Sequence, residues 1–185
     1  MAMIRICISG MTASGKTSLG HMLAAELNIA HITKHTLDAF HKATEEATKK
    51  GKSKLEVINV TITREHAKNF DDELVQLAAK KDCVITTWLG PWLIKDATLN
   101  VWLNASLAHR AERRAKDEKM NVEEARELIN EKDLQNMKAF KEVQGIDLND
   151  HSMFDIELNT EKMSLKEMVA VISMMALSKE KKLFT

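Results

Sequence analysis

A glycine-rich loop near the N-terminus has the residue types and the spacing that bind phosphate groups. It runs from Gly10 to Thr17 and matches the pattern G-x-x-x-x-G-K-[ST]. In such a loop the glycines let successive backbone amides point inward, and the following helix adds its own free N–H groups. Lys16 is expected to reach the β and γ phosphates of a nucleoside triphosphate, and the Thr17 hydroxyl to bind the Mg²⁺ that bridges them. The expected binding residues are Gly10, Met11, Thr12, Ala13, Ser14, Gly15, Lys16, Thr17 and Ser18.

A second group of residues could stabilise the charge of a phosphoryl group in transfer. Arg110, Arg113 and Arg114 are spaced i, i+3 and i+4 on a helix predicted to begin near Ser106, so one helical face can present two or three cations. In the transition state of phosphoryl transfer, negative charge accumulates on the equatorial oxygens of the phosphoryl group, and positioned guanidinium groups stabilise that charge. We therefore expect Lys16, Arg110 and Arg113 to be catalytic, the alternative for each arginine being the solvated face of a helix.

The elements that must position these residues alternate along the chain. Apolar runs predict buried strands, and the amphipathic periods between them predict helices, the last of which opens with the capping-box pair Ser164 and Glu167. This alternation favours an α/β fold in which helices cover both faces of a parallel sheet. The run 57–62 is ambiguous between strand and helix. The five predicted strands are 3–9, 29–33, 83–88, 99–103 and, more weakly, 153–158.

Two charged helical segments interrupt the simple alternation, and their places narrow the reaction class. They span 36–80, before the third strand, and 107–143, after the fourth. Small kinases carry an acceptor-binding insert and a basic lid at these two places. A GTPase would be expected to show Asn-Lys-x-Asp, whereas residues 130–133 read Asn-Glu-Lys-Asp. We therefore predict one P-loop kinase domain over 1–185, a three-layer sandwich with a helical insert and a helical lid.

Composition limits the partners and the compartment. The 185 residues include 27 basic and 27 acidic side chains, so the chain lacks the positive field that accompanies non-specific nucleic-acid binding. The two cysteines match neither a disulfide framework nor a zinc pattern, and no apolar stretch approaches the roughly 20 residues that span a bilayer. We expect a cytoplasmic monomer or weak homodimer that binds nucleotide substrates but neither nucleic acid nor membrane.

Several segments, in order along nearly the whole chain, resemble the archaeal-type cytidylate kinases of the nucleoside monophosphate kinase family. This resemblance implies a five-stranded parallel sheet, an acceptor-binding helical insert, a mobile lid and ATP with Mg²⁺ as cofactors. It also implies transfer of the γ-phosphoryl group of ATP to a nucleoside monophosphate, with CMP or dCMP favoured. The segments are Ile-Ser-Gly at 8–10, the P-loop, Leu-Asn-Val-Trp-Leu-Asn-Ala-Ser-Leu at 99–107, Arg-Ala-Glu-Arg at 110–113, Gly-Ile-Asp-Leu-Asn-Asp at 145–150 and Asn-Thr at 159–160.

The resemblance fails where the acceptor would bind. Family members usually carry Glu-Gly-Arg after the third strand, the arginine being an acceptor-phosphate ligand, but here Thr86, Thr87 and Trp88 follow. The arginine expected in the insert is also absent, because Phe40 is followed by His41. Candidates for a rebuilt acceptor site are Lys34, His35, His41, Lys42, Arg64, Trp88 and Trp92, and candidates for orienting Mg²⁺ waters are Asp38, Asp71 and Asp72.

Three functions therefore remain open from the sequence. The leading one is a nucleoside monophosphate kinase with a rebuilt acceptor site. The second is a kinase for another small metabolite, and the third is an ATP-binding regulator whose acceptor site has degenerated.

Overall fold

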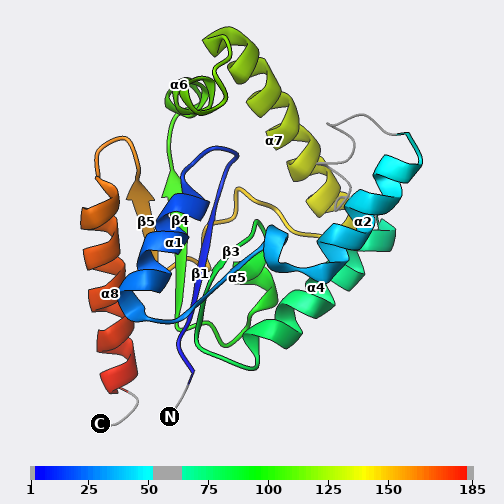
Figure 1. Cartoon of the computed structure of the whole chain (residues 1–185). Coiled ribbons are helices and arrows are strands. Elements are labelled where there is room, and N and C mark those ends of the chain that lie inside the picture. Colours follow the sequence, from blue (N-terminus) through cyan, green and yellow to red (C-terminus); the bar gives the residue numbers. More distant parts are fainter. Residues whose placement is uncertain (1–2, 52–63, 183–185) are drawn as a thin grey trace.

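The computed structural model describes residues 3–51 and 64–182, with side chains over 3–51 and 68–179. These residues form a five-stranded sheet in the order β2-β3-β1-β4-β5, and every neighbouring pair of strands is parallel (Figure 1). The predicted α/β class and parallel sheet are confirmed. The ambiguous run 57–62 and the side chain of Arg64 lie outside the described residues. The strands are β1 (Arg5–Gly10), β2 (Ala30–Thr33), β3 (Cys83–Thr86), β4 (Leu99–Asn104) and β5 (Ile156–Asn159).

β1 occupies the centre of the sheet and is buried on both faces. Ile6, Cys7 and Ile8 have no exposed surface, as expected for a parallel strand whose two faces both carry helices. β1 pairs with β3 on one side and with β4 on the other, and Gly10 lies opposite Leu103. The carboxyl ends of the strands therefore meet at one edge of the sheet, which is where ligands bind in open α/β folds.

Helices cover the sheet in two layers, which confirms the three-layer sandwich. On one face, α1 (Lys16–Leu27) and α8 (Leu165–Lys182) pack on alternate side chains of the central strands (Figure 1). On the other face, α2 (Asp38–Lys49), α4 (Arg64–Ala78) and the short α5 (Gly90–Leu93) enclose a second core cluster. The predicted capping box of α8 is present, because Ser164 N–H donates to Glu167 and Glu167 N–H donates to Ser164 Oγ.

The third strand is shorter than the predicted run 83–88. β3 ends at Thr86, because the chain leaves the ladder there to enter α5, and the Trp88 carbonyl instead accepts a hydrogen bond from Ser9 Oγ at 2.7 Å. Trp88 therefore lies in the connection beyond the carboxyl end of β3 rather than inside the sheet.

The described parts of the two charged segments are mainly helical, as predicted. The segment 36–80 follows the 3₁₀ turn η1 (Lys34–Thr36) and contains α2 and α4, while 107–143 contains α6 (Leu107–Glu118) and most of α7 (Val122–Gln144). Ser106 caps α6 by accepting from His109 N–H at 3.2 Å. α6 and α7 pack on each other through alanines and Ile129, and Ala13 of the P-loop joins this cluster, so the helix pair rests on the loop (Figure 1).

Both cysteines are free and buried. Burial, the largest cause, raises the pKa of the Cys83 thiol to about 11, which makes it a poor nucleophile at neutral pH. Among the described helices, none combines the length and the apolar character that crossing a membrane requires.

Close packing of α1 on β3 gives a testable prediction about Gly20. A Cβ atom at this position would lie 2.3 Å from Thr86 Cγ2 and 2.6 Å from His31 Nε2. The clash in Gly20→Ala is expected to outweigh the roughly 1 kcal/mol that alanine gains in a helix. The free energy of unfolding, measured by urea denaturation, should fall by about 1–2 kcal/mol. The exposed control Glu26→Ala on the same helix should stay within about 0.5 kcal/mol, and a stabilised Gly20→Ala would contradict the close approach.

Candidate nucleotide site

The P-loop joins β1 to α1 with a backbone that glycine makes possible. Gly10 has φ 147° and Gly15 has φ 98°, and Ala13 between them also adopts the left-handed region at φ 61°. A Cβ atom at Gly10 would lie 2.6 Å from the Leu103 carbonyl oxygen, so β4 leaves no room for a side chain. Both glycines of the motif are therefore required by geometry, and the loop curls as an anion-binding nest does.

Polar groups of this loop are available to a ligand. Ser14 is fully buried, yet its Oγ has no hydrogen-bond partner among the described residues. No described side chain caps the N-terminus of α1, and Thr17 and Ser18 in its first turn are exposed. An orphaned buried hydroxyl and an uncapped helix N-terminus suit the oxygens of a triphosphate, so the residues present fit this group.

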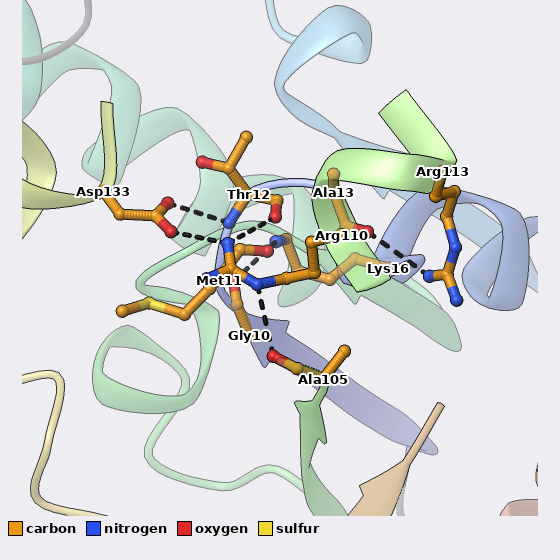
Figure 2. A network of polar contacts seen from close by, with 9 residues as sticks. All are labelled: Gly10, Met11, Thr12, Ala13, Lys16, Ala105, Arg110, Arg113 and Asp133. Atoms are coloured by element: carbon orange, nitrogen blue, oxygen red, sulfur yellow. Dashed lines mark hydrogen bonds and ion pairs between the residues drawn. The ribbon is translucent and has the colours of Figure 1, made fainter. Parts of the chain in front are cut away.

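Lys16 lies inside the loop. Its Nζ donates to the Gly10 carbonyl at 2.5 Å and to the Met11 carbonyl at 2.7 Å (Figure 2). The same atom lies 4.9 Å from the centroid of the Trp88 ring. Burial, the largest cause, lowers the pKa of Lys16 to about 7, and the charges of Lys132, Arg110 and Lys34 lower it further against the opposing effect of Asp133. The ammonium group is thus held by neutral acceptors, which phosphate oxygens would replace.

A buried carboxylate ties the helix pair to the loop. Asp133 of α7, only 4% exposed, accepts from Thr12 N–H at 3.0 Å and from Arg110 Nη1 at 2.6 Å (Figure 2). Arg110 of α6 also donates from Nη1 to the Thr12 carbonyl at 2.9 Å and from Nε to the Ala105 carbonyl at 3.2 Å. Both peptide groups that flank the Thr12 Cα are therefore engaged by side chains from α6 and α7.

Asp133 is the principal residue of this site that the sequence reasoning missed. In the sequence, the segment 130–133 stands out only as a poor match to a base-reading motif. The signal that could reveal Asp133 is its spacing, because Ala125, Ile129 and Asp133 are four residues apart along α7 and are all buried. An aspartate on the apolar face of a helix needs a buried cationic partner, and Arg110 provides it.

The two other arginines of α6 diverge. Arg113 lies over the P-loop, donating to the Ala13 carbonyl at 3.3 Å and to the Thr160 carbonyl at 3.4 Å. Arg114 pairs with Glu118 along its own helix at 3.0 Å. The structure therefore brings Arg110 and Arg113 to the P-loop, whereas Arg114 pairs within α6.

The carboxylates considered for Mg²⁺ lie apart from the loop. Asp38 and Asp72 line a groove between α2 and α4, and Asp71 accepts from Gln144 Nε2 at 2.8 Å. Within the described part of the chain, no group of three or more His, Cys, Asp or Glu side chains could hold a metal ion. Thr17 therefore remains the predicted protein ligand of Mg²⁺.

The aromatic and histidine candidates for the acceptor site also differ in their distance from the P-loop. Trp88 stays near the loop, contacting Lys16 and also Phe140 of α7, with 6.0 Å between the ring centroids. Trp92 packs edge-on against Phe154 at 5.5 Å, and His41 Nε2 bonds to the His35 carbonyl at 2.8 Å. Of the two tryptophans, Trp88 is the one in contact with a P-loop side chain.

Comparison with known proteins identifies the family. The profile of the cytidylate kinase-like family matches residues 5–162. Cytidylate kinase of Pyrococcus horikoshii is 34% identical over 172 residues, which cover 90% of this chain and 85% of that protein. Cytidylate kinase of Sulfurisphaera tokodaii is 35% identical over 170 residues, covering 90% and 92%. The chain belongs to the cytidylate kinase-like family.

Solved structures agree with this membership at the level of the fold. An uncharacterized protein from Eubacterium ventriosum superposes with a TM-score of 0.73 at 15% identity, covering 95% of this chain and 99% of its own. Shikimate kinase from Acinetobacter baumannii gives a TM-score of 0.55 at 16% identity, covering 96% and 94%. This cytidylate kinase-like protein therefore has the P-loop kinase fold, and kinases of this type use ATP with Mg²⁺.

The buried pair of Asp133 and Arg110 predicts a large effect of neutralising one partner. Asp133→Asn leaves the guanidinium group uncompensated in a buried site, so the free energy of unfolding should fall by about 3–5 kcal/mol in urea denaturation. The control Glu123→Gln, which removes the carboxylate of an exposed pair with Arg126, should change it by less than about 1 kcal/mol. Equal effects of the two substitutions would contradict the importance of the buried pair.

The lowered pKa of Lys16 predicts proton uptake on nucleotide binding. With a pKa of about 7, Lys16 is mostly neutral at pH 8 in the free protein, and a bound triphosphate should return it to the charged form. Calorimetry at pH 8 in buffers of different ionisation enthalpy should therefore show uptake approaching one proton, and the affinity should fall as pH rises above 7.

Two comparisons check that Lys16 is the origin of this uptake. The uptake should shrink at pH 6, where Lys16 is already charged, and in Lys16→Arg, whose guanidinium stays charged throughout. Absence of uptake at pH 8 in the unmodified protein would contradict the prediction.

Proposed function

We propose that this protein is an ATP- and Mg²⁺-dependent nucleoside monophosphate kinase that transfers the γ-phosphoryl group of ATP to CMP or dCMP. The observation that carries the proposal is the intact P-loop in a chain about one-third identical to cytidylate kinases over 90% of its length. The second support is the α6–α7 pair, which brings Arg110 and Arg113 onto that loop.

The proposed mechanism uses the residues at the carboxyl edge of the sheet. The loop amides and the N-terminus of α1 bind the β and γ phosphates, and Lys16 exchanges its two carbonyl partners for phosphate oxygens. The Thr17 hydroxyl would hold Mg²⁺, which would supply positive charge to the phosphate groups. Arg113 lies beside Gly15, where the phosphates bind, and Asp133 holds Arg110 against the loop. Alignment of the acceptor phosphate with the γ-phosphorus is then most of the catalytic task.

We also propose the remaining organisation expected from the sequence. The chain would be one kinase domain over 1–185, with 36–80 as the acceptor-binding insert and 107–143 as the lid. It would act in the cytoplasm as a monomer or weak homodimer, without nucleic-acid or membrane partners. The free buried cysteines and the balanced charge support this assignment.

Trp88 is the observation that favours a second candidate, a kinase for another small metabolite. The tryptophan contacts Lys16 at the position where the resemblance leads one to expect an acceptor-binding arginine. The identity to cytidylate kinases favours the monophosphate kinase, whereas the likeness to shikimate kinase and gluconokinase, at 16% identity, bears on the fold alone.

A coupled assay of ADP formation tests the proposed function. With ATP and Mg²⁺, CMP or dCMP should give the highest kcat/KM among the common nucleoside monophosphates. Lys16→Ala should lower kcat by about 10²- to 10³-fold, the range seen when one donor to transition-state charge is removed. Lys95→Ala, on the exposed stretch before β4, should leave it unchanged. If no monophosphate stimulates ADP formation and a non-nucleotide acceptor does, the second candidate would replace the proposal.

A further inference from the structure

The ring of Trp88 contacts the ammonium group of the P-loop lysine. Lys16 Nζ lies over the ring, 4.9 Å from its centroid, which is within the range of a cation–π interaction. The other two tryptophans, Trp92 and Trp102, both pack on Phe154, with 5.5 Å and 5.2 Å between ring centroids. Trp88 is half-buried, and among the described residues it is the tryptophan whose ring contacts a cation of the site.

Contacts from two other elements fix the place of this ring. Ser9 of β1 is fully buried and donates from its Oγ to the Trp88 carbonyl at 2.7 Å. The chain then turns tightly into α5, because a Cβ atom at Gly90 would lie 3.1 Å from Ile85 Cγ2. Phe140 of α7 contacts the ring itself, with 6.0 Å between centroids. β1 and α7 therefore both hold Trp88 relative to the P-loop.

One face of α7 reaches the P-loop at two points. Asp133 accepts a hydrogen bond from Thr12 N–H at 3.0 Å, and Phe140 reaches Lys16 through the ring of Trp88. Residues seven positions apart lie on the same face of an α-helix, so both contacts belong to one surface of α7. The helix that fixes the backbone of the loop thus also contacts the residue that lies against its lysine.

An aromatic ring suits this lysine better than a second polar side chain would. The ring attracts the ammonium charge through its quadrupole and takes up none of the oxygen acceptors that the N–H groups use. Phosphate oxygens can therefore replace the Gly10 and Met11 carbonyls as partners of Lys16 while the ring stays in place. An arginine at position 88 would instead add a second positive charge.

We propose that Trp88 is a positioning residue for Lys16, whose ammonium group it holds in the P-loop through the face of its ring. The inference rests on the proposed function, in which Lys16 binds the β and γ phosphates of ATP. A lysine held in place before the nucleotide arrives loses less side-chain freedom on binding, so the ring raises the affinity for the triphosphate. Trp88 thereby serves the donor half of the site, although the resemblance leads one to expect an acceptor-binding arginine there.

Substitutions that separate the ring from its apolar volume test the inference. Trp88→Leu keeps an apolar side chain without a ring and should lower the affinity for a non-hydrolysable ATP analogue by about 10-fold in calorimetry. Trp88→Phe keeps a ring that attracts cations less strongly and should lose only about threefold. The matched control Trp92→Phe, in α5 and packed on Phe154, should change the affinity by less than about twofold. Equal losses in Trp88→Leu and Trp88→Phe would overturn the inference.

A double-mutant cycle shows whether Trp88 acts through Lys16. Lys16→Ala removes the ammonium group, so adding Trp88→Leu to it should lower the affinity for the analogue by less than about a further twofold. A further loss as large as in the unmodified background would overturn the inference, because the ring would then act on the nucleotide directly. Thermal unfolding curves verify that each variant is folded, and Trp88→Met replaces Trp88→Leu if the latter is unfolded.

Kinetic constants separate the donor half of the site from the acceptor half. In the coupled assay with CMP, Trp88→Leu should lower kcat/KM for ATP by about 10-fold and leave KM for CMP within about twofold. A rise in KM for CMP alone would overturn the inference and assign the ring to the acceptor. If the unmodified protein phosphorylated no monophosphate, the proposed function would fail, while the affinities for the ATP analogue would still decide the role of Trp88.

Discussion

The rest of the site depends on one buried interaction, in which the Asp133 carboxylate joins the Thr12 amide of the P-loop to the Arg110 guanidinium of α6. Each partner would be costly to bury alone, because both carry charge in a region from which water is largely excluded. Together they neutralise each other and hold both flanking peptide groups of Thr12. The shape of the phosphate loop and the docking of the α6–α7 pair are thereby coupled, so neither can change without breaking the other's hydrogen bonds.

A surplus of positive charge follows from this arrangement. The Asp133 carboxylate already accepts hydrogen bonds from Thr12 and Arg110, and the Lys16 ammonium group donates only to neutral carbonyls. Burial, the largest cause, and neighbouring cations lower the pKa of Lys16 to about 7 and that of Lys34 to about 8. Phosphate groups would remove the mutual repulsion that the folded chain tolerates. The buried positive charge that destabilises the free protein therefore favours the binding of nucleotide phosphates. Perturbed pKa values of this kind are typical of functional sites.

The two halves of the site differ in how closely they follow the family. The loop, the helix N-terminus and the arginines of α6 preserve what the resemblance implies for the triphosphate. On the acceptor side, Trp88 stands where the resemblance leads one to expect an arginine, and its ring contacts both Lys16 and Phe140. A bulky aromatic ring contributes contact area but no charge, so the positive charge for an acceptor phosphate has to come from other elements of the fold.

The sequence by itself determined the features that depend on local pattern. The P-loop, the five apolar strands, the helix start near Ser106 and the capping box at Ser164 could be recognised because each is encoded in a few consecutive residues. Strand ends were less predictable: β3 stops at Thr86 because α5 has to begin nearby, a demand of packing rather than of propensity. Only the tertiary structure decided that Asp133 meets Arg110 and that Arg113 and Arg114 diverge. These contacts join residues up to about a hundred positions apart, and their energies depend on burial and on neighbouring charges that no local pattern records.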